Sequence, residues 1–163
     1  MNLVQLRTEF GASRASCNCR ECRRNCMFLP GFLIPADLPR MIPEGADPLS
    51  WAELNLLASP GTIVMKNGKL FRIPTLVPAT KPDGSCIHYQ KRSCQIWEVS
   101  PFGCAFFGCG AQDEDRLSHE GVNAIYAAQC DPESLYRRIW SHLWDMGKQQ
   151  DPVEEIRARK EGR

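Results

Sequence analysis

The sequence predicts an α+β fold: a small, irregular, cysteine-rich metal-binding domain with a β-hairpin and C-terminal helices. Three observations support this prediction. Alternating residues flank an Asn-Gly pair at residues 67–68, helical periodicity follows residue 113, and eight of the nine cysteines fall into two groups. The composition becomes helical after the stretch "SPFGCAFFGCG", and irregular, proline-rich connections complete the α+β outline.

The length and charge of the chain limit its organisation. A chain of 163 residues fits one domain, and we assign residues 1–147 to a single metal-binding domain. Residues 148–163 contain nine charges, so we expect a charged, flexible tail. A net charge of +1 argues against nucleic-acid or membrane binding. Because the start lacks the apolar segment of a secretory signal, we expect a cytoplasmic protein.

The first half of the domain combines proline-broken turns with one helix and one hairpin. Five prolines between residues 30 and 48 permit at most a short helix near 36–42. A helix begins at Asp47-Pro48, with Asp47 as its cap, and its apolar face comprises Leu49, Leu54, Leu56 and Leu57. The stretch "TIVMKNGKLFRI" predicts a hairpin with a type I′ turn at Asn67-Gly68.

The second half leads from short strands into helices. The stretches "CIHYQ" and "CQIWEV" predict two short strands joined by a turn. Residues 113–129 predict a helix with Leu117, Gly121, Ile125 and Ala128 along one face. A second helix starts at Asp131-Pro132, carries Leu135, Ile139, Leu143 and Met146 at helical spacing, and stops at Gly147.

The cysteines carry the chemistry. The first group is Cys17, Cys19, Cys22 and Cys26, and the second is Cys86, Cys94, Cys104 and Cys109. In a reducing compartment such clusters are more often metal ligands than disulfides, and short loops let several thiolates converge on a soft metal. The eight form either two sets of four or one site with spare thiols. Cys130, alone on an expected helix, is interpreted as a small buried packing residue.

Eight thiolates without a clear histidine pair favour one or two 4Fe-4S clusters over zinc. Nearby aromatic residues (Trp97, Phe102, Phe106 and Phe107) and N–H groups of Gly103, Gly108 and Gly110 would tune such a cluster, although core packing explains the aromatic residues equally well. The Asn-Gly hairpin and the Cys-x2-Cys spacing leave a structural zinc module as the alternative. Cys19, Cys22 and Cys26 are separated by two and then three residues, whereas radical SAM enzymes use Cys-x3-Cys-x2-Cys. The spacing therefore argues against radical SAM chemistry.

Two stretches resemble a known family. "CRECRRNCMFLPGFLIPADLPRM" and "GSCIHYQKRSCQIWEVSPFGCAFF" are similar to the zinc- or iron-chelating proteins defined by a CxxCxxCC-type cysteine motif. The resemblance covers residues 17–107 and implies a metal-ligand role for Cys19, Cys22, Cys26, Cys86, Cys94 and Cys104. The chain departs from the family pattern in lacking the adjacent Cys-Cys pair, in having "VSP" before Cys104, and in the extra Cys109.

Other residues have weaker claims to a role. His88 would share a strand face with Cys86, yet a packed or surface histidine explains it better, and His119 and His142 are interpreted as structural. Arg20, Arg23 and Arg24 either neutralise thiolates, hold an acidic partner or sit in a solvated loop. Trp140 and Trp144 lie one helical turn apart and are expected in the core or at an interface.

We therefore expect a redox or sensing module that passes electrons to a protein partner. A zinc-based docking module and a metal-dependent enzyme are the alternatives. For an enzyme, Glu98 and Asp83 are the nearest carboxylates in sequence, and no catalytic residue is assigned. The partner and the oligomeric state stay open.

Overall fold

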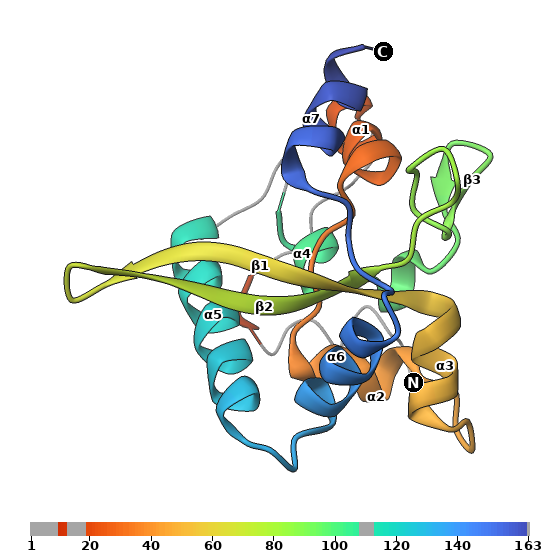
Figure 1. The fold of residues 1–163 in the computed structure, drawn as a ribbon. Coiled ribbons are helices and arrows are strands. Elements are labelled where there is room, and N and C mark those ends of the chain that lie inside the picture. Colours follow the sequence, from red (N-terminus) through yellow and green to blue (C-terminus); the bar gives the residue numbers. More distant parts are fainter. Residues whose placement is uncertain (1–9, 13–18, 108–112, 163) are drawn as a thin grey trace.

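A computed structural model describes residues 10–12, 19–107 and 113–162, and it has the predicted α+β fold (Figure 1). The helices of the described residues include two short 3-10 turns, η2 and η3, among the α-helices. They are α1 (Arg20–Phe28), η2 (Pro35–Asp37), α2 (Leu38–Met41), α3 (Pro48–Asn55), η3 (Trp97–Val99), α4 (Phe102–Ala105), α5 (Glu114–Cys130), α6 (Leu135–Asp145) and α7 (Val153–Glu161). The strands form two separate antiparallel pairs, β1 (Leu56–Lys66) with β2 (Lys69–Pro78), and β3 (Tyr89–Gln90) with β4 (Ser93–Cys94).

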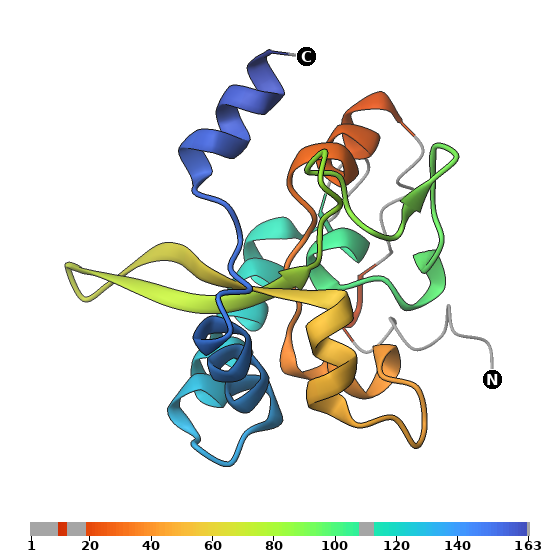
Figure 2. The same cartoon turned by 45° about the vertical axis from the view of Figure 1, so that its right-hand side comes forward.

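The long hairpin of β1 and β2 runs from a turn that projects on one side into the middle of the molecule (Figures 1 and 2). Its turn is the one the sequence predicts, because Asn67 and Gly68 both have positive φ angles, of 52° and 71°. The pairing continues well beyond the predicted segment, to Leu56 opposite Pro78. A bulge between Ser59 and Thr62 divides the hairpin into an inner half and a projecting half.

The inner half of the hairpin lies in the hydrophobic core. Leu56, Ala58 and Leu76 are fully buried there, and helices α3, α5 and α6 supply the residues that cover them. The Tyr136 hydroxyl of α6 accepts a hydrogen bond from the Leu76 backbone N–H (2.9 Å) and donates one to the Leu33 carbonyl (2.7 Å). Burial of the Tyr136 hydroxyl raises its pKa far above the usual range, so this link persists at any physiological pH.

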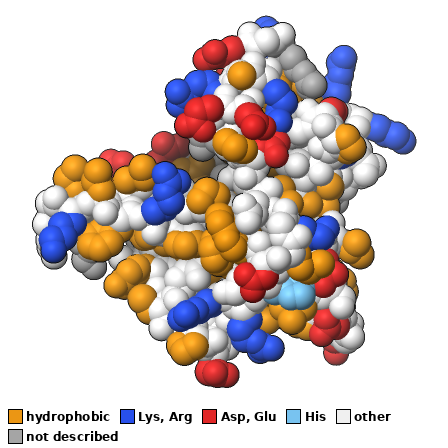
Figure 3. Space-filling view, in the orientation of Figure 1, with side chains coloured by type: hydrophobic (Ala, Val, Ile, Leu, Met, Phe, Trp, Pro, Cys, Tyr) orange, Lys and Arg blue, Asp and Glu red, His pale blue; other side chains and the backbone are white. Residues whose placement is uncertain are grey.

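The projecting half of the hairpin extends away from the core. Ile63, Met65, Leu70 and Phe71 are exposed there, and Figure 3 shows hydrophobic side chains gathered over this part of the surface. We call residues 62–72 the hairpin arm; Ile73, next along β2, is buried in the core.

The helix at Asp47 begins as predicted but ends earlier. The Asp47 carboxylate accepts a hydrogen bond from the Ser50 backbone N–H at 2.9 Å, which caps α3. The predicted apolar face is wrong, because Leu54 is 76% exposed and Leu56 and Leu57 belong to β1. Helix α3 ends at Asn55 and β1 begins at Leu56. No glycine or proline marks this boundary, so the apolar spacing alone does not locate it.

The helical C-terminal half is confirmed. In α5, Leu117, Gly121 and Ile125 are buried, as predicted. In α6, Ile139 and Leu143 are buried, and Gly147 follows the helix with a φ angle of 73°. Met146 differs from the prediction, because it lies past the end of α6 and is 47% exposed.

The charged C-terminal segment contains a helix where the sequence predicts a flexible tail. Helix α7 runs beside α1, and its Ile156 is only 6% exposed (Figure 1). The Arg24 guanidinium of α1 donates a hydrogen bond to the Lys160 carbonyl at 3.1 Å. One buried isoleucine and this link hold the helix on the cysteine-rich part of the chain, a contact that composition does not indicate. Within the described ranges, no helix combines the length and hydropathy required to cross a bilayer.

Candidate metal centre

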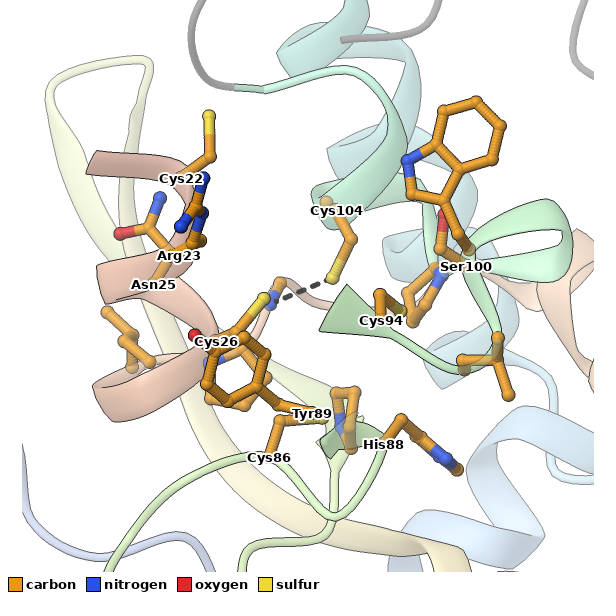
Figure 4. A pocket seen from close by; sticks show the side chains of 18 of the residues that line it. Cys22, Arg23, Asn25, Cys26, Cys86, His88, Tyr89, Cys94, Ser100 and Cys104 are labelled. Atoms are coloured by element: carbon orange, nitrogen blue, oxygen red, sulfur yellow. Dashed lines mark hydrogen bonds between the residues drawn. The ribbon is translucent and has the colours of Figure 1, made fainter. Parts of the chain in front are cut away.

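The first cysteine group lies on a helix rather than in the expected loop. Cys19 caps α1, with its sulfur accepting a hydrogen bond from the Cys22 backbone N–H, and the two sulfurs are 3.4 Å apart. Cys26 follows one turn after Cys22, so both thiols leave the same helix face (Figure 4). Cys17 lies outside the described residues.

The second group comes from two other segments. Cys86 precedes β3, Cys94 ends β4, and Cys104 lies in α4. The Cys86 backbone N–H donates to the Cys26 carbonyl at 2.7 Å, which joins the two groups directly. The predicted strands are therefore confirmed only as the short pair β3–β4, in which Tyr89 stands opposite Cys94. Cys109 lies outside the described residues.

Two glycines bring Cys104 close to the end of α1. A Cβ atom on Gly31 would lie 2.3 Å from the Gly103 carbonyl carbon, and one on Gly103 would lie 2.5 Å from the Phe32 nitrogen. The Gly103 N–H donates to the Phe32 carbonyl at 2.9 Å, and the Gly31 N–H donates to the Cys104 sulfur at 3.3 Å (Figure 4). This backbone contact requires glycine on both sides.

A buried carboxylate fixes the same junction. Asp37 is fully buried, and one of its oxygens accepts hydrogen bonds from the backbone N–H groups of Ile34 and Phe102, both at 2.9 Å. Because Phe102 opens α4, Asp37 positions the helix that carries Cys104. The sequence offered only a weak signal for Asp37, the Pro-x-Asp helix start.

Five cysteines line one cavity of about 380 Å³. Figure 4 shows them on the surrounding elements: Cys22, Cys26, Cys86, Cys94 and Cys104. Cys19 joins them through its contact with Cys22. Six of the eight predicted ligands therefore lie at or beside one cavity. They do not converge on a point, because among the described residues no three His, Cys, Asp or Glu side chains are arranged to hold a metal ion.

The surroundings of Cys86 and Cys104 favour protonated thiols in the metal-free protein. Burial, with a smaller contribution from the charge of Cys94, raises the pKa of Cys86 to about 11. The Cys104 thiol is enclosed by protein although its residue keeps some exposed surface. Burial, followed by the charges of Cys26, Cys86 and Cys94, raises its pKa well above the usual range, while the Gly31 N–H opposes the shift. A bound cation would reverse these effects and release protons.

The aromatic residues near the second group divide between cavity and core. Trp97 and Phe107 line the cavity. Phe102 and Phe106 are fully buried and pack against the Phe10 ring, at centroid distances of 5.1 and 5.5 Å. Core packing is therefore the role of these two. Of the three glycines considered as donors to a cluster, Gly103 donates elsewhere, and Gly108 and Gly110 lie outside the described residues.

His88 also lines the cavity, but its ring extends away from the Cys104 sulfur in Figure 4. Its Nε2 atom is buried and has no hydrogen-bond partner among the described residues. Burial lowers the pKa of His88, so its ring is neutral at physiological pH. This placement fits the packed histidine that the sequence favours.

The remaining candidates lie elsewhere. The Asp83 carboxylate accepts hydrogen bonds from the Ser85 N–H and hydroxyl within a turn, and neither Asp83 nor Glu98 lines the cavity. Cys130 is exposed at the end of α5, so its interpretation as a buried packing residue is wrong. Trp140 and Trp144 stack at 4.9 Å and pack against the core, as expected.

Searches of protein-family models, curated proteins and solved structures return no match to this chain.

Proposed function

We propose that this protein binds one or two 4Fe-4S clusters through its two cysteine groups and acts in redox transfer or sensing with a protein partner in the cytoplasm. One observation carries the proposal: five cysteines from three separate segments line a single cavity. The resemblance of residues 17–107 to metal-chelating cysteine-cluster proteins supports the same assignment.

The type of side chain at the cavity favours a cluster over a single zinc ion. Five cysteines line the cavity, whereas the ring of the lining histidine, His88, extends away from the Cys104 sulfur (Figure 4). Several thiolates without histidine are the ligands that iron–sulfur clusters use. When bound, such a cluster would accept and release single electrons.

A second candidate, a structural zinc module, is favoured by one contact. The sulfurs of Cys19 and Cys22 are 3.4 Å apart, close to the separation of two ligands on one zinc ion. In that case Cys19 and Cys22 would hold the ion together with other thiols, and its role would be to fix α1 against the second group.

Anaerobic purification with iron, zinc and acid-labile sulfide analysis tests the proposal. We expect a brown protein with iron and sulfide in near-equal amounts, and visible absorption that bleaches on reduction. Cys26→Ser and Cys104→Ser should lose the colour. Cys130→Ser is the matched control, because its thiol is exposed and away from the cavity. Stoichiometric zinc without sulfide would support the zinc module, and full iron content in Cys26→Ser and Cys104→Ser would contradict the assigned site.

A further inference from the structure

Two arginines stand at the cysteine cavity on different elements. Arg23 belongs to α1, beside Cys22 and Cys26, and Arg92 belongs to the turn between β3 and β4, beside Cys94. Both line the cavity, and Figure 4 shows Arg23 next to the cysteines of α1. The sequence drew attention to the arginines of α1 but not to Arg92, whose proximity depends on the pairing of β3 with β4.

The turn that carries Arg92 has an unfavourable backbone. Gln90 pairs with Ser93, so Lys91 and Arg92 form a two-residue loop, and their φ angles are 48° and 63°. Side chains with a Cβ atom rarely adopt this left-handed conformation, and two in succession are unusual. The turn of the long hairpin has the same positive φ angles, and there they belong to Asn67 and Gly68, the residues that adopt them most readily. A basic pair at the second turn therefore indicates a role for the side chains themselves.

The charge around the cavity differs from that of the rest of the chain. Helix α1 and the 91–92 turn together contain five basic residues and one acidic residue, a net charge of +4. The whole chain has a net charge of +1, so the remainder is net acidic. Helix α7, which lies beside α1, carries three acidic and three basic residues and adds no net charge. The positive charge is therefore concentrated on α1 and the 91–92 turn, from which Arg23 and Arg92 line the cavity.

Apolar surface accompanies these arginines. Leu29, which lines the cavity at the end of α1, is 48% exposed, and Tyr89 and Trp97 line it from the second group. A free inorganic anion is not stabilised by contact with apolar side chains. Interfaces between proteins, in contrast, combine exposed apolar and aromatic side chains with arginine.

We propose that the cavity rim at Arg23, Arg92 and Leu29, with Lys91 beside it in the turn, docks an acidic segment of a protein partner. The inference rests on the proposed function, since it identifies the class of partner that approaches the metal centre. Arg92 and Arg23 pair with carboxylates of the partner segment, and Leu29 contacts one of its apolar side chains. Long-range attraction steers the partner to the cavity, and salt weakens the encounter.

Fluorescence anisotropy with a labelled peptide of alternating Glu and Leu residues tests the proposal. We expect the purified protein to bind this peptide at 20 mM NaCl, with at least tenfold weaker binding at 200 mM. Arg92→Glu should weaken binding at 20 mM at least tenfold. Arg138→Glu is the matched control, an exposed arginine of α6 outside the cavity lining, and should bind like the wild type. Equal effects of these two variants would overturn the proposal.

A double variant separates docking from folding. Lys91→Asn with Arg92→Gly copies the turn of the long hairpin, so it should raise the melting temperature while abolishing peptide binding. Unchanged peptide binding in this variant would refute the proposed surface. Inorganic phosphate and a single-stranded oligonucleotide serve as competitors. Displacement of the peptide by either at equal or lower concentration would show a general anion site and overturn the assignment to a protein segment.

This readout does not require a metal. If metal and sulfide analysis finds no cluster but Arg92 still controls peptide binding, the proposed function fails while the docking surface stands. If a cluster is present and the peptide does not bind, the docking surface alone is refuted.

Discussion

Substituting Gly31 with alanine tests how the second cysteine group is held against the first. The new Cβ atom would lie 2.3 Å from the Gly103 carbonyl carbon and 2.4 Å from the Cys104 nitrogen, whereas ordinary contacts begin at 3.4 Å. The two backbones must therefore separate by about 1 Å, since neither is a flexible side chain that can turn aside. The 3.3 Å hydrogen bond from the Gly31 N–H to the Cys104 sulfur would be lost with this movement.

The expected cost follows from these contacts. Overpacking destabilises the protein by about 1–3 kcal/mol and the lost hydrogen bond by about 1 kcal/mol. Alanine also restricts the unfolded chain more than glycine does, which stabilises the folded state by up to about 1 kcal/mol. We expect a loss of about 1–4 kcal/mol in the free energy of unfolding, measured by urea denaturation of the metal-free protein. The anaerobically purified variant should also contain less metal, because Cys104 has moved.

The matched control is Gly162→Ala at the end of α7. Its Cβ atom would meet only the Ala158 carbonyl oxygen as closely as 3.3 Å, so we expect a change within about 0.5 kcal/mol. If Gly31→Ala and Gly162→Ala have the same denaturation midpoint, the close approach of the two backbones does not exist as described.

Two further predictions concern buried groups beside the cavity. Asp37→Ala would leave two buried N–H donors without an acceptor, so we expect a loss of about 2–4 kcal/mol in urea denaturation. Asp47→Ala, which removes an exposed helix cap, should cost about 1 kcal/mol, and an equal cost for both would contradict the role of Asp37. For Cys86, the pKa rises from 9.0 to about 11 on folding, so the unfolded chain loses this proton first as pH rises. The metal-free protein should therefore lose about 2–3 kcal/mol between pH 9 and 11 through this group. Denaturation of Cys86→Ser across that range should show a smaller loss, and identical pH profiles would refute the assignment.

Local rules predict much of this fold. The Asn67-Gly68 pair supplies the positive φ angles of a type I′ turn, Asp47-Pro48 starts α3, and apolar spacing locates the buried faces of α5 and α6. Each of these signals lies within a few residues of the structure it determines. The grouping of the cysteines was equally informative, since six of the eight predicted ligands lie at or beside one cavity.

The features that could not be predicted depend on contacts between distant segments. Helix α1 was expected to be a loop, because the cysteine spacing was interpreted as a turn around a metal, although Arg and Glu between the cysteines form helices well. Helix α7 buries Ile156 against the rest of the chain, which composition does not reveal. The glycine contact between residues 31 and 103 is invisible until both segments are placed.

The hairpin arm has a consequence for how the protein behaves in concentrated solution. Both strands of a two-stranded arm are edge strands, with unpaired backbone groups that another copy of the chain can use to extend the sheet. The exposed Ile63, Met65 and Leu70 add apolar surface to these edges. Lys69 and Arg72 bring like charges together when two arms approach, which opposes this association. Because salt screens that repulsion, the colloidal stability of the protein depends on ionic strength through a part of the chain that lies mostly outside its core.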